Sequence, residues 1–155
     1  MRTLIMKTLG IAITVFFSQW VYSSQLTIID TNNVKYVISD SQLLDMPQTT
    51  ITTTLPWLEE EATFRGVTLQ TLFEQSNLTL PQNLTFIALN NYQIDIPKSD
   101  IETYSPIIAI HKDDAPMSIR DKGPFWVIFP IASKPELDTT DYHAKMIWQL
   151  KNIQM

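Results

Sequence analysis

Apolar and polar residues alternate with a period of two over several short segments of this chain, which is the pattern of half-buried β-strands. Polar residues at 30–33 separate the first two segments and predict an opening hairpin. Asn90 and Asn91, which tolerate positive φ, predict a second hairpin. The strands expected along the chain are residues 26–30, 34–39, 49–54, 84–89, 92–96, 107–111, 125–129 and 147–153.

Short helices are expected between these strands, because residues that cap helices precede apolar positions with helical spacing. Ser39 or Asp40 is expected to cap a helix over residues 42–45. Thr68 is expected to cap a second helix that carries the apolar face Leu69, Leu72 and Phe73. The other helical segments expected are 97–101 and, opened by Asp138, 142–145. Strands and short helices in this mixture predict an α+β domain.

The first residues are expected to lie outside that domain. Arg2 and Lys7 precede an apolar run at 9–17, and small residues follow, with Ser23 and Ser24 near the expected cleavage point. This order predicts a signal peptide over residues 1–24. The apolar run is shorter than the roughly 20 residues of a membrane span. We therefore expect residues 25–155 to form one exported domain without a membrane span.

Composition narrows the possible partners. The 155 residues include 11 basic and 16 acidic ones, and loss of Arg2 and Lys7 with the signal peptide would leave a net charge of −7. Such an acidic chain is not expected to bind nucleic acid. The chain has no cysteine, which excludes disulfides and a lipid-anchored lipoprotein. The acidic run at 59–61 is expected to be a solvated loop.

Five segments carry a resemblance to a known family. They are TTITTTLPW at 49–57, FRGVTLQTL at 64–72, ALNNY at 88–92, PMSIRDKGPFW at 116–126 and IWQL at 147–150. In this order they resemble the sulfite-oxidase-type molybdopterin-binding domain, and more closely its small exported single-domain bacterial members. The resemblance spans about residues 26–153. It implies an α+β fold with mixed sheets and short helices, a periplasmic location, and a pocket for a molybdopterin cofactor near the loop after residues 49–54.

The same resemblance implies that one cysteine thiolate holds molybdenum, and Thr53 is the position that matches this cysteine. A threonine hydroxyl is not a soft ligand and cannot replace the thiolate. Molybdenum-centred chemistry is therefore disfavoured. Two interpretations of residues 49–54 remain open: a strand that borders a ligand pocket, and a half-buried strand composed of residues with high β propensity.

Three basic residues are candidates for contact with a ligand. The resemblance places Arg65, Arg120 and Lys122 on loops near the pocket mouth. An arginine fork suits the phosphate of a pterin cofactor or a small oxyanion such as sulfite. The alternative for Arg120 and Lys122 is ion pairing with neighbouring aspartates on the surface.

Aromatic residues complete the predicted site. Trp57 and Tyr92 lie beside turn-forming residues and are expected to stack on a flat heterocycle, whereas Trp126 and Trp148 are expected to fill the core. The two histidines, His111 and His143, lack companions at the spacing of metal ligands, and each is expected to be structural or at the surface.

Two functions remain open. The first is a non-catalytic ligand-binding or accessory module, which takes a small anionic or pterin-like ligand or docks onto a membrane sensor or redox partner protein. The absence of cysteine favours it. The second is a molybdopterin-dependent oxidoreductase that acts on a small oxyanion or sulfoxide, with molybdenum held by the cofactor and by oxygen ligands. The near full-length resemblance favours the second.

Overall fold

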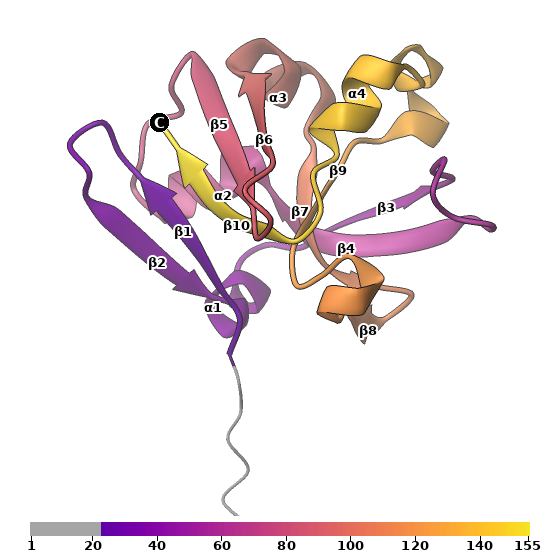
Figure 1. Ribbon diagram of the computed structural model, residues 1–155, viewed down its shortest axis with the longest axis horizontal. Helices are drawn as coiled ribbons and strands as arrows, with labels where there is room; N and C mark the ends of the chain where they lie inside the picture. Colours follow the sequence, from indigo (N-terminus) through magenta and orange to yellow (C-terminus); the bar gives the residue numbers. More distant parts are fainter. Residues whose placement is uncertain (1–22) are drawn as a thin grey trace, which may run out of the picture.

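Two five-stranded sheets form the frame of the computed structural model, which describes residues 23–155 (Figure 1). The first sheet has the order β2-β1-β10-β5-β6 and comprises β1 (Gln25–Ile29), β2 (Lys35–Ser39), β5 (Asn83–Ala88), β6 (Gln93–Pro97) and β10 (Leu150–Gln154). The second has the order β3-β4-β7-β8 and comprises β3 (Thr49–Thr53), β4 (Ala62–Thr68), β7 (Ile107–Lys112) and β8 (Ala115–Pro116), with β9 (Trp126–Ile128) also paired to β7.

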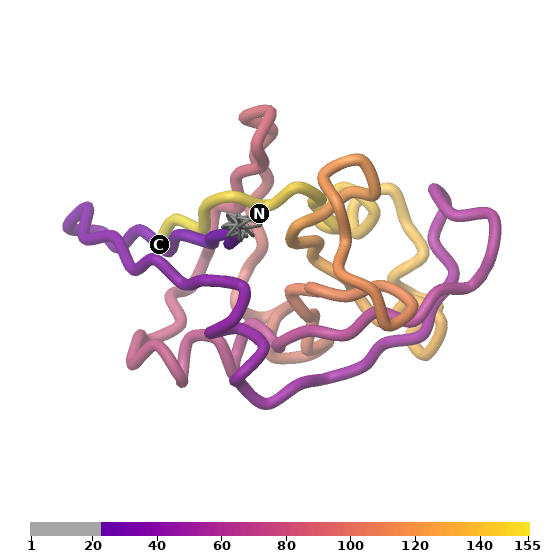
Figure 2. Tube along the Cα trace, turned by 90° about the horizontal axis from the view of Figure 1, so that it is seen from below, coloured from indigo at the N-terminus to yellow at the C-terminus, as the bar shows by residue number. Residues whose placement is uncertain are grey.

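The parallel pairing of β1 with β10 makes the first sheet a mixed one, whereas the pairings of the second sheet are antiparallel. Figure 2 shows the yellow C-terminal strand beside the indigo β1. The backbone N–H of Met155 extends this pairing by donating to the carbonyl of Ile29. The two ends of the domain are therefore held together in one sheet.

Short helices connect the strands. They are α1 (Asp40–Asp45), α2 (Leu69–Gln75), α3 (Lys98–Tyr104) and α4 (Thr140–Lys145), with 3-10 turns η1 (Ile119–Asp121), η2 (Ile131–Ser133) and η3 (Pro135–Leu137). Ser39 caps α1 in a capping box with Gln42, and the Thr68 hydroxyl accepts from the Thr71 N–H at the start of α2. Both predicted caps are confirmed, and so is the α+β class.

The core lies between the two sheets and is built from their buried strands. Phe125–Phe129 and Ile107–Ala109 have no exposed surface, which agrees with the continuous apolar pattern of these segments. The Trp126 ring packs edge-on against Phe64 of β4 with centroids 5.3 Å apart. Trp126 was expected in the core, and this expectation is confirmed.

The departures from the expected elements include one helix cap, one strand start and one missing strand. Thr139, not Asp138, caps α4, because its hydroxyl accepts from the Tyr142 N–H while the Asp138 carboxylate bonds to a histidine. The last strand begins at Leu150 and not at 147, because Gln149 has a φ of 51°, which no strand accommodates. Residues 62–68 form a strand, β4, that the expected elements lacked.

The predicted signal peptide falls mostly on residues 1–22, which lie outside the described residues. Within residues 23–155, no helix has the length and apolar character needed to cross a membrane.

We expect Gly66→Ala to lower the free energy of unfolding by more than about 2 kcal/mol. Gly66 lies at an irregularity in the β4–β7 pairing, and a Cβ there would overlap the carbonyl oxygen of Ile108 and lie 2.7 Å from the Cα of Ala109. Urea unfolding followed by tryptophan fluorescence measures the change. Thr50→Ala, at an exposed position of β3, is the control and should cost less than about 1 kcal/mol. Equal losses in both variants would contradict this account of Gly66.

Candidate functional site

A cavity of about 410 Å³ lies where the loop after β3, the turn between β5 and β6, and the continuous stretch 140–148 meet. The turn between β5 and β6 contributes Asn90 and Tyr92, α4 contributes Thr140 and His143, the segment before β10 contributes Trp148, and the loop after β3 contributes Trp57. The volume lies within the range of small-molecule sites, and aromatic and apolar side chains make up most of the wall. This cavity is the candidate site.

Indole rings form one side of the cavity. The Trp57 and Trp148 rings pack edge to face with centroids 5.2 Å apart, and Trp57 lies 6.2 Å from the buried ring of Trp126. The Trp126 N–H donates to the carbonyl of Met146 at 3.0 Å, which fixes the segment that carries Trp148. Trp148 was expected in the core; it packs against the core but also forms cavity wall. Flat aromatic walls of this kind suit the face of a planar ligand.

His143 forms another part of the wall, although its spacing in the sequence gave no sign of this. Its Nε2 lies 2.8 Å from Oδ1 of Asp138, and its ring packs edge-on against Trp57 at 5.8 Å. Asp138 precedes the cap of α4, so the first turn of the helix brings the carboxylate back to the ring. Asp138 and His143 come into contact only when the first turn of α4 has formed. The spacing of the two residues in the sequence therefore did not predict the pair.

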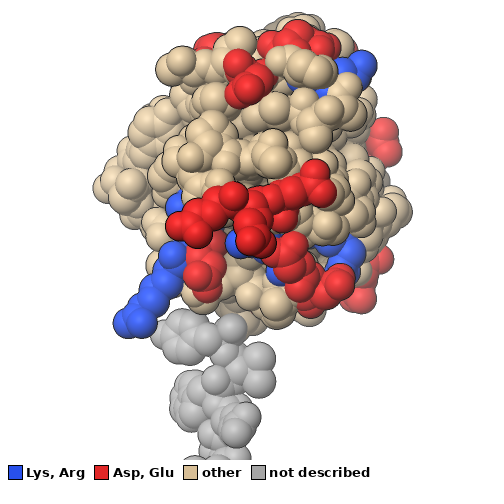
Figure 3. Space-filling view, turned by 90° about the vertical axis from the view of Figure 1, so that its right-hand side faces the viewer, with Lys and Arg blue, Asp and Glu red and all other residues tan. Residues whose placement is uncertain are grey.

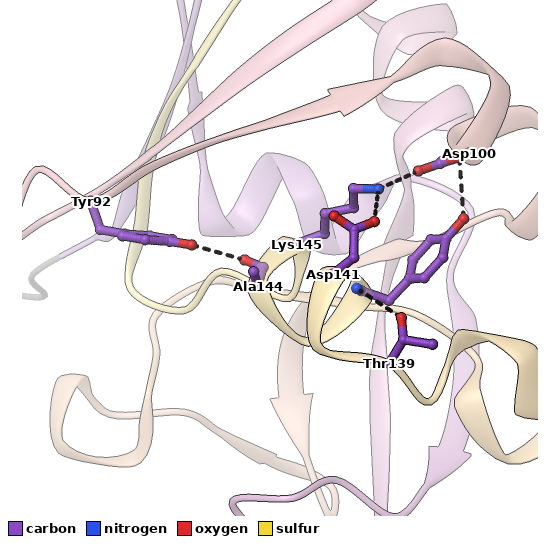
Figure 4. Close-up of polar contacts among 7 residues, drawn as sticks. Tyr92, Asp100, Thr139, Asp141, Ala144 and Lys145 are labelled. Atoms are coloured by element: carbon purple, nitrogen blue, oxygen red, sulfur yellow. Dashed lines mark hydrogen bonds and ion pairs between the residues drawn. The ribbon is translucent and has the colours of Figure 1, made fainter.

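Tyr92 closes the cavity on the side of the β5–β6 turn. Its hydroxyl donates to the carbonyl of Ala144 in α4 at 3.4 Å, as Figure 4 shows, while the residue remains 45% exposed. Asn91 has a φ of 66° and the Asn90 side chain accepts from the Tyr92 N–H, so the predicted asparagine turn is confirmed. The turn therefore carries Tyr92 to the cavity mouth.

An ion-pair cluster holds α4 in place behind the cavity. Lys145 Nζ lies 3.0 Å from an Asp100 oxygen in α3 and 2.6 Å from an Asp141 oxygen, and the Tyr142 hydroxyl bonds to Asp100 at 3.3 Å (Figure 4). Burial by itself would lower the pKa of Lys145, but the hydrogen bonds to Asp141 and Asp100 outweigh it and raise the pKa. Burial, and then the charge of Asp100, raise the pKa of Tyr142.

Lys122 lies on the aromatic cluster. Its ammonium is 5.1 Å from the ring centre of Trp148 and 5.8 Å from that of Trp126, within the range of cation–π contact. Within residues 23–155, Lys122 makes no ion pair with an aspartate: Asp121 accepts from Ser118, and Asp113 pairs with Lys112. Lys122 thus brings a positive charge to the indole that lines the cavity.

The two predicted arginines lie away from the cavity wall. Arg120 is exposed on η1, two residues before Lys122. Arg65 lies on β4 opposite His111 of β7, and its guanidinium contacts His111 Nδ1. Burial and then the charge of Arg65 lower the pKa of His111, against an opposite effect of Asp114. Of the predicted contacts, the structure brings Trp57, Tyr92 and Lys122 to the cavity region.

Thr53 has no exposed surface, and both capacities of its hydroxyl are used inside the protein. The hydroxyl donates to the carbonyl of Thr54 and accepts from the Ala132 N–H, each at 3.2 Å, which ties η2 to the end of β3. The described residues also contain no group of three or more His, Cys, Asp or Glu side chains placed to hold a metal. These residues do not fit a thiolate-bound molybdenum, whereas the aromatic cavity fits a flat ring system.

The acidic run at 59–61 is exposed, as expected for a solvated loop. It borders a shallow recess together with Lys112 and Asp113, and Figure 3 shows acidic side chains in a band across this end of the molecule. Such a face is unsuited to an anionic ligand.

Comparison with known proteins supports the fold. No protein-family model matches the sequence, and no curated protein matches it either. Among solved structures, the chain is similar to the sulfane dehydrogenase SoxCD from Paracoccus pantotrophus, with a TM-score of 0.63 and 13% sequence identity. The match covers 84% of this chain and 37% of that chain, so the chain spans little more than a third of its neighbour. At this identity the likeness concerns the fold alone, and the predicted sulfite-oxidase-like α+β fold is confirmed.

We expect Lys145→Met to lower the free energy of unfolding by about 2–3 kcal/mol, because it leaves the Asp100 carboxylate without its cation. The side chains of Lys145 and Asp100 are only 12% and 14% exposed. Asp141→Asn, which removes the 69% exposed partner of the same lysine, is the control and should cost under about 1 kcal/mol. Urea unfolding compares the two. A smaller loss for Lys145→Met than for Asp141→Asn would contradict the proposed role of the buried pair.

We expect stability to fall on mild acidification partly through His111. The folded state favours the neutral ring, so this contribution is complete above the unfolded pKa of about 6.5 and is lost as the pH falls below it toward the folded-state pKa. Unfolding free energies measured at pH 7.5, 6.5 and 5.5 should therefore decline less in His111→Gln than in the wild type. The same decline in both proteins would exclude His111 as a source of the pH dependence.

Proposed function

We propose that this protein is an exported, non-catalytic ligand-binding or accessory module whose aromatic cavity takes a pterin-like or similar flat heterocycle. The observation that carries the proposal is the cavity itself, with Trp57 and Trp148 on one side and Lys122 against the Trp148 ring. Stacking on indole provides affinity without covalent chemistry. The buried, fully bonded hydroxyl of Thr53 supports a role that does not depend on a metal centre.

We further propose that the chain is a small member of the sulfite-oxidase-type molybdopterin-binding family that lacks the molybdenum-ligating cysteine. Two observations support this assignment: the five sequence segments described above, and the fold likeness over 84% of the chain. The proposal includes a signal peptide at 1–24, one molybdopterin-binding-like domain at 25–155, and a periplasmic location. Molybdopterin is then the proposed ligand, with molybdenum disfavoured.

The predicted contact residues have different roles in this proposal. Trp57 and Tyr92 contact the ring of the ligand, and Lys122 supplies positive charge for an anionic substituent. Arg120 stays the predicted contact for a phosphate that projects beyond the cavity, since it lies on the same turn as Lys122. Thr53 was also predicted as a ligand contact, but its side chain has no exposed surface and its hydroxyl bonds to Thr54 and Ala132, so it takes no part in this proposal. Arg65 lies away from the cavity wall, with its guanidinium on His111. A membrane sensor or redox protein is the proposed partner.

The second candidate is a molybdopterin-dependent oxidoreductase that acts on a small oxyanion or sulfoxide without thiolate ligation of the metal. The observation in its favour is the likeness of fold to a sulfane dehydrogenase. Fold likeness is a weak reason for a shared activity, because one fold supports many functions. The donor groups at Thr53 do not fit the metal, so we place this candidate second.

Pterin and molybdenum content test both candidates. We expect protein purified from the periplasm of its host to release a fluorescent pterin on acid treatment, with molybdenum far below one atom per chain by elemental analysis. Trp57→Ala should lose the pterin, because it removes one stacking wall. The control is Tyr36→Ala, which truncates a half-buried aromatic residue on β2, outside the cavity wall.

The other outcomes separate the candidates. Stoichiometric molybdenum together with turnover would favour the oxidoreductase. The absence of both pterin and metal would overturn the pterin-like ligand, and retention of pterin by Trp57→Ala would place its site elsewhere.

A further inference from the structure

The pair of His143 and Asp138 lies in the wall of the cavity, and the proposed function above makes no use of it. His143 Nε2 is 2.8 Å from Asp138 Oδ1, and the histidine is part of the lining. A carboxylate that is ionised at neutral pH only accepts hydrogen bonds, so Nε2 carries the proton. In the neutral ring the other nitrogen, Nδ1, is then a hydrogen-bond acceptor.

Nδ1 of His143 makes no hydrogen bond within the described residues and is not a buried atom. In residues 23–155, Gln48 Oε1 is the one buried side-chain nitrogen or oxygen atom that lacks a hydrogen-bond partner. His143 Nδ1 has no partner within that part of the chain, so it reaches accessible surface. The same reasoning applies to the indole N–H groups of Trp57 and Trp148, two further residues of the cavity lining. The lining residues thus carry one ring acceptor and two indole donors that reach accessible surface.

This set of polar groups fits a particular class of ligand. A ring N–H would donate to His143 Nδ1, and a carbonyl oxygen beside that N–H would accept from an indole N–H. Lactams and cyclic imides of planar heterocycles carry these two groups side by side. Stacking on the aromatic walls does not distinguish rings that carry the N–H from rings that lack it. The hydrogen bonds to His143 Nδ1 and to an indole N–H therefore provide the discrimination.

We infer that His143, oriented by Asp138, selects planar heterocycles that present a ring N–H beside a carbonyl, and disfavours their N-alkylated analogues. The inference rests on the proposed function, because it concerns the same cavity. His143 contacts the ligand, and Asp138 is a positioning residue that fixes which ring nitrogen holds the proton.

Calorimetric titration at pH 7.5 with lumazine and 1,3-dimethyllumazine tests the inference. Both probes are flat pteridinediones, and the second has lost both ring N–H groups. We expect the wild type to bind lumazine at least about fivefold more tightly than the dimethyl compound, the effect of one hydrogen bond. Thermal denaturation of each variant shows that it is folded.

Three variants separate the hydrogen bond from the added bulk of the methyl groups. His143→Gln keeps a donor for Asp138 but has no acceptor at the Nδ1 position, and it should reduce the preference to about one through weaker lumazine binding. His143→Asn retains an acceptor near that position and should restore part of the preference. Asp138→Ala frees the proton to move to Nδ1 and should lower the preference while binding of dimethyllumazine persists.

The outcomes distinguish the inference from the proposed function. A preference that survives unchanged in His143→Gln would overturn the inference and leave a pterin-like ligand in place. Equal affinity of the wild type for both probes would also overturn the inference and leave the pterin-like ligand in place. Failure of the wild type to bind either probe would overturn the inference together with the pterin-like ligand.

Discussion

The buried indole of Trp126 connects the core of the second sheet to the cavity, and the site depends on this junction. One edge of the ring meets Phe64 of β4, and its N–H holds the carbonyl of Met146. The carbonyl belongs to the segment that then carries Trp148 into the cavity wall and enters β10 in the first sheet. A buried indole N–H needs an acceptor, and this hydrogen bond acts together with the backbone bonds from Val127 N–H to the Ile147 carbonyl and from Leu150 N–H to the Phe125 carbonyl to fix where the two sheets meet. Trp57 completes the wall by packing on both neighbouring indoles.

A second constraint determines where α4 lies. The helix has only six residues and no buried apolar residue of its own, so its position cannot come from hydrophobic packing alone. Lys145 instead links it to α3 through the poorly exposed carboxylate of Asp100. Removing water from such a pair has a cost, which the two charge-assisted hydrogen bonds of the lysine offset. The result is a fixed helix that presents His143 to the cavity and Ala144 to the hydroxyl of Tyr92.

Local sequence signals predicted the fold well where short-range physics decides the structure. Ser39 and Thr68 cap helices because their hydroxyls reach backbone N–H groups three residues ahead, and that geometry needs no tertiary contact. Asn91 adopts positive φ for an equally local reason. The predictions were wrong where a hydrogen bond formed in the folded structure competes with the local conformational preference of the segment. Asp138 is a good cap by type but is bonded to His143, and Gln149 leaves the extended conformation where its N–H meets the carbonyl of Lys122.

The sequence by itself determined most of the strand and helix pattern, with β4 the exception, together with the acidic charge, the lack of any thiolate, and the candidacy of Trp57 and Tyr92 as aromatic residues beside turns. Only the tertiary structure decided which side chains share a cavity. Trp148 and His143 joined it because β10 and α4 pack beside the β5–β6 turn, while Arg65 and Arg120 stayed outside its wall. The physical reason is that periodicity and capping act over a few residues, whereas a cavity wall depends on contacts between segments tens of residues apart.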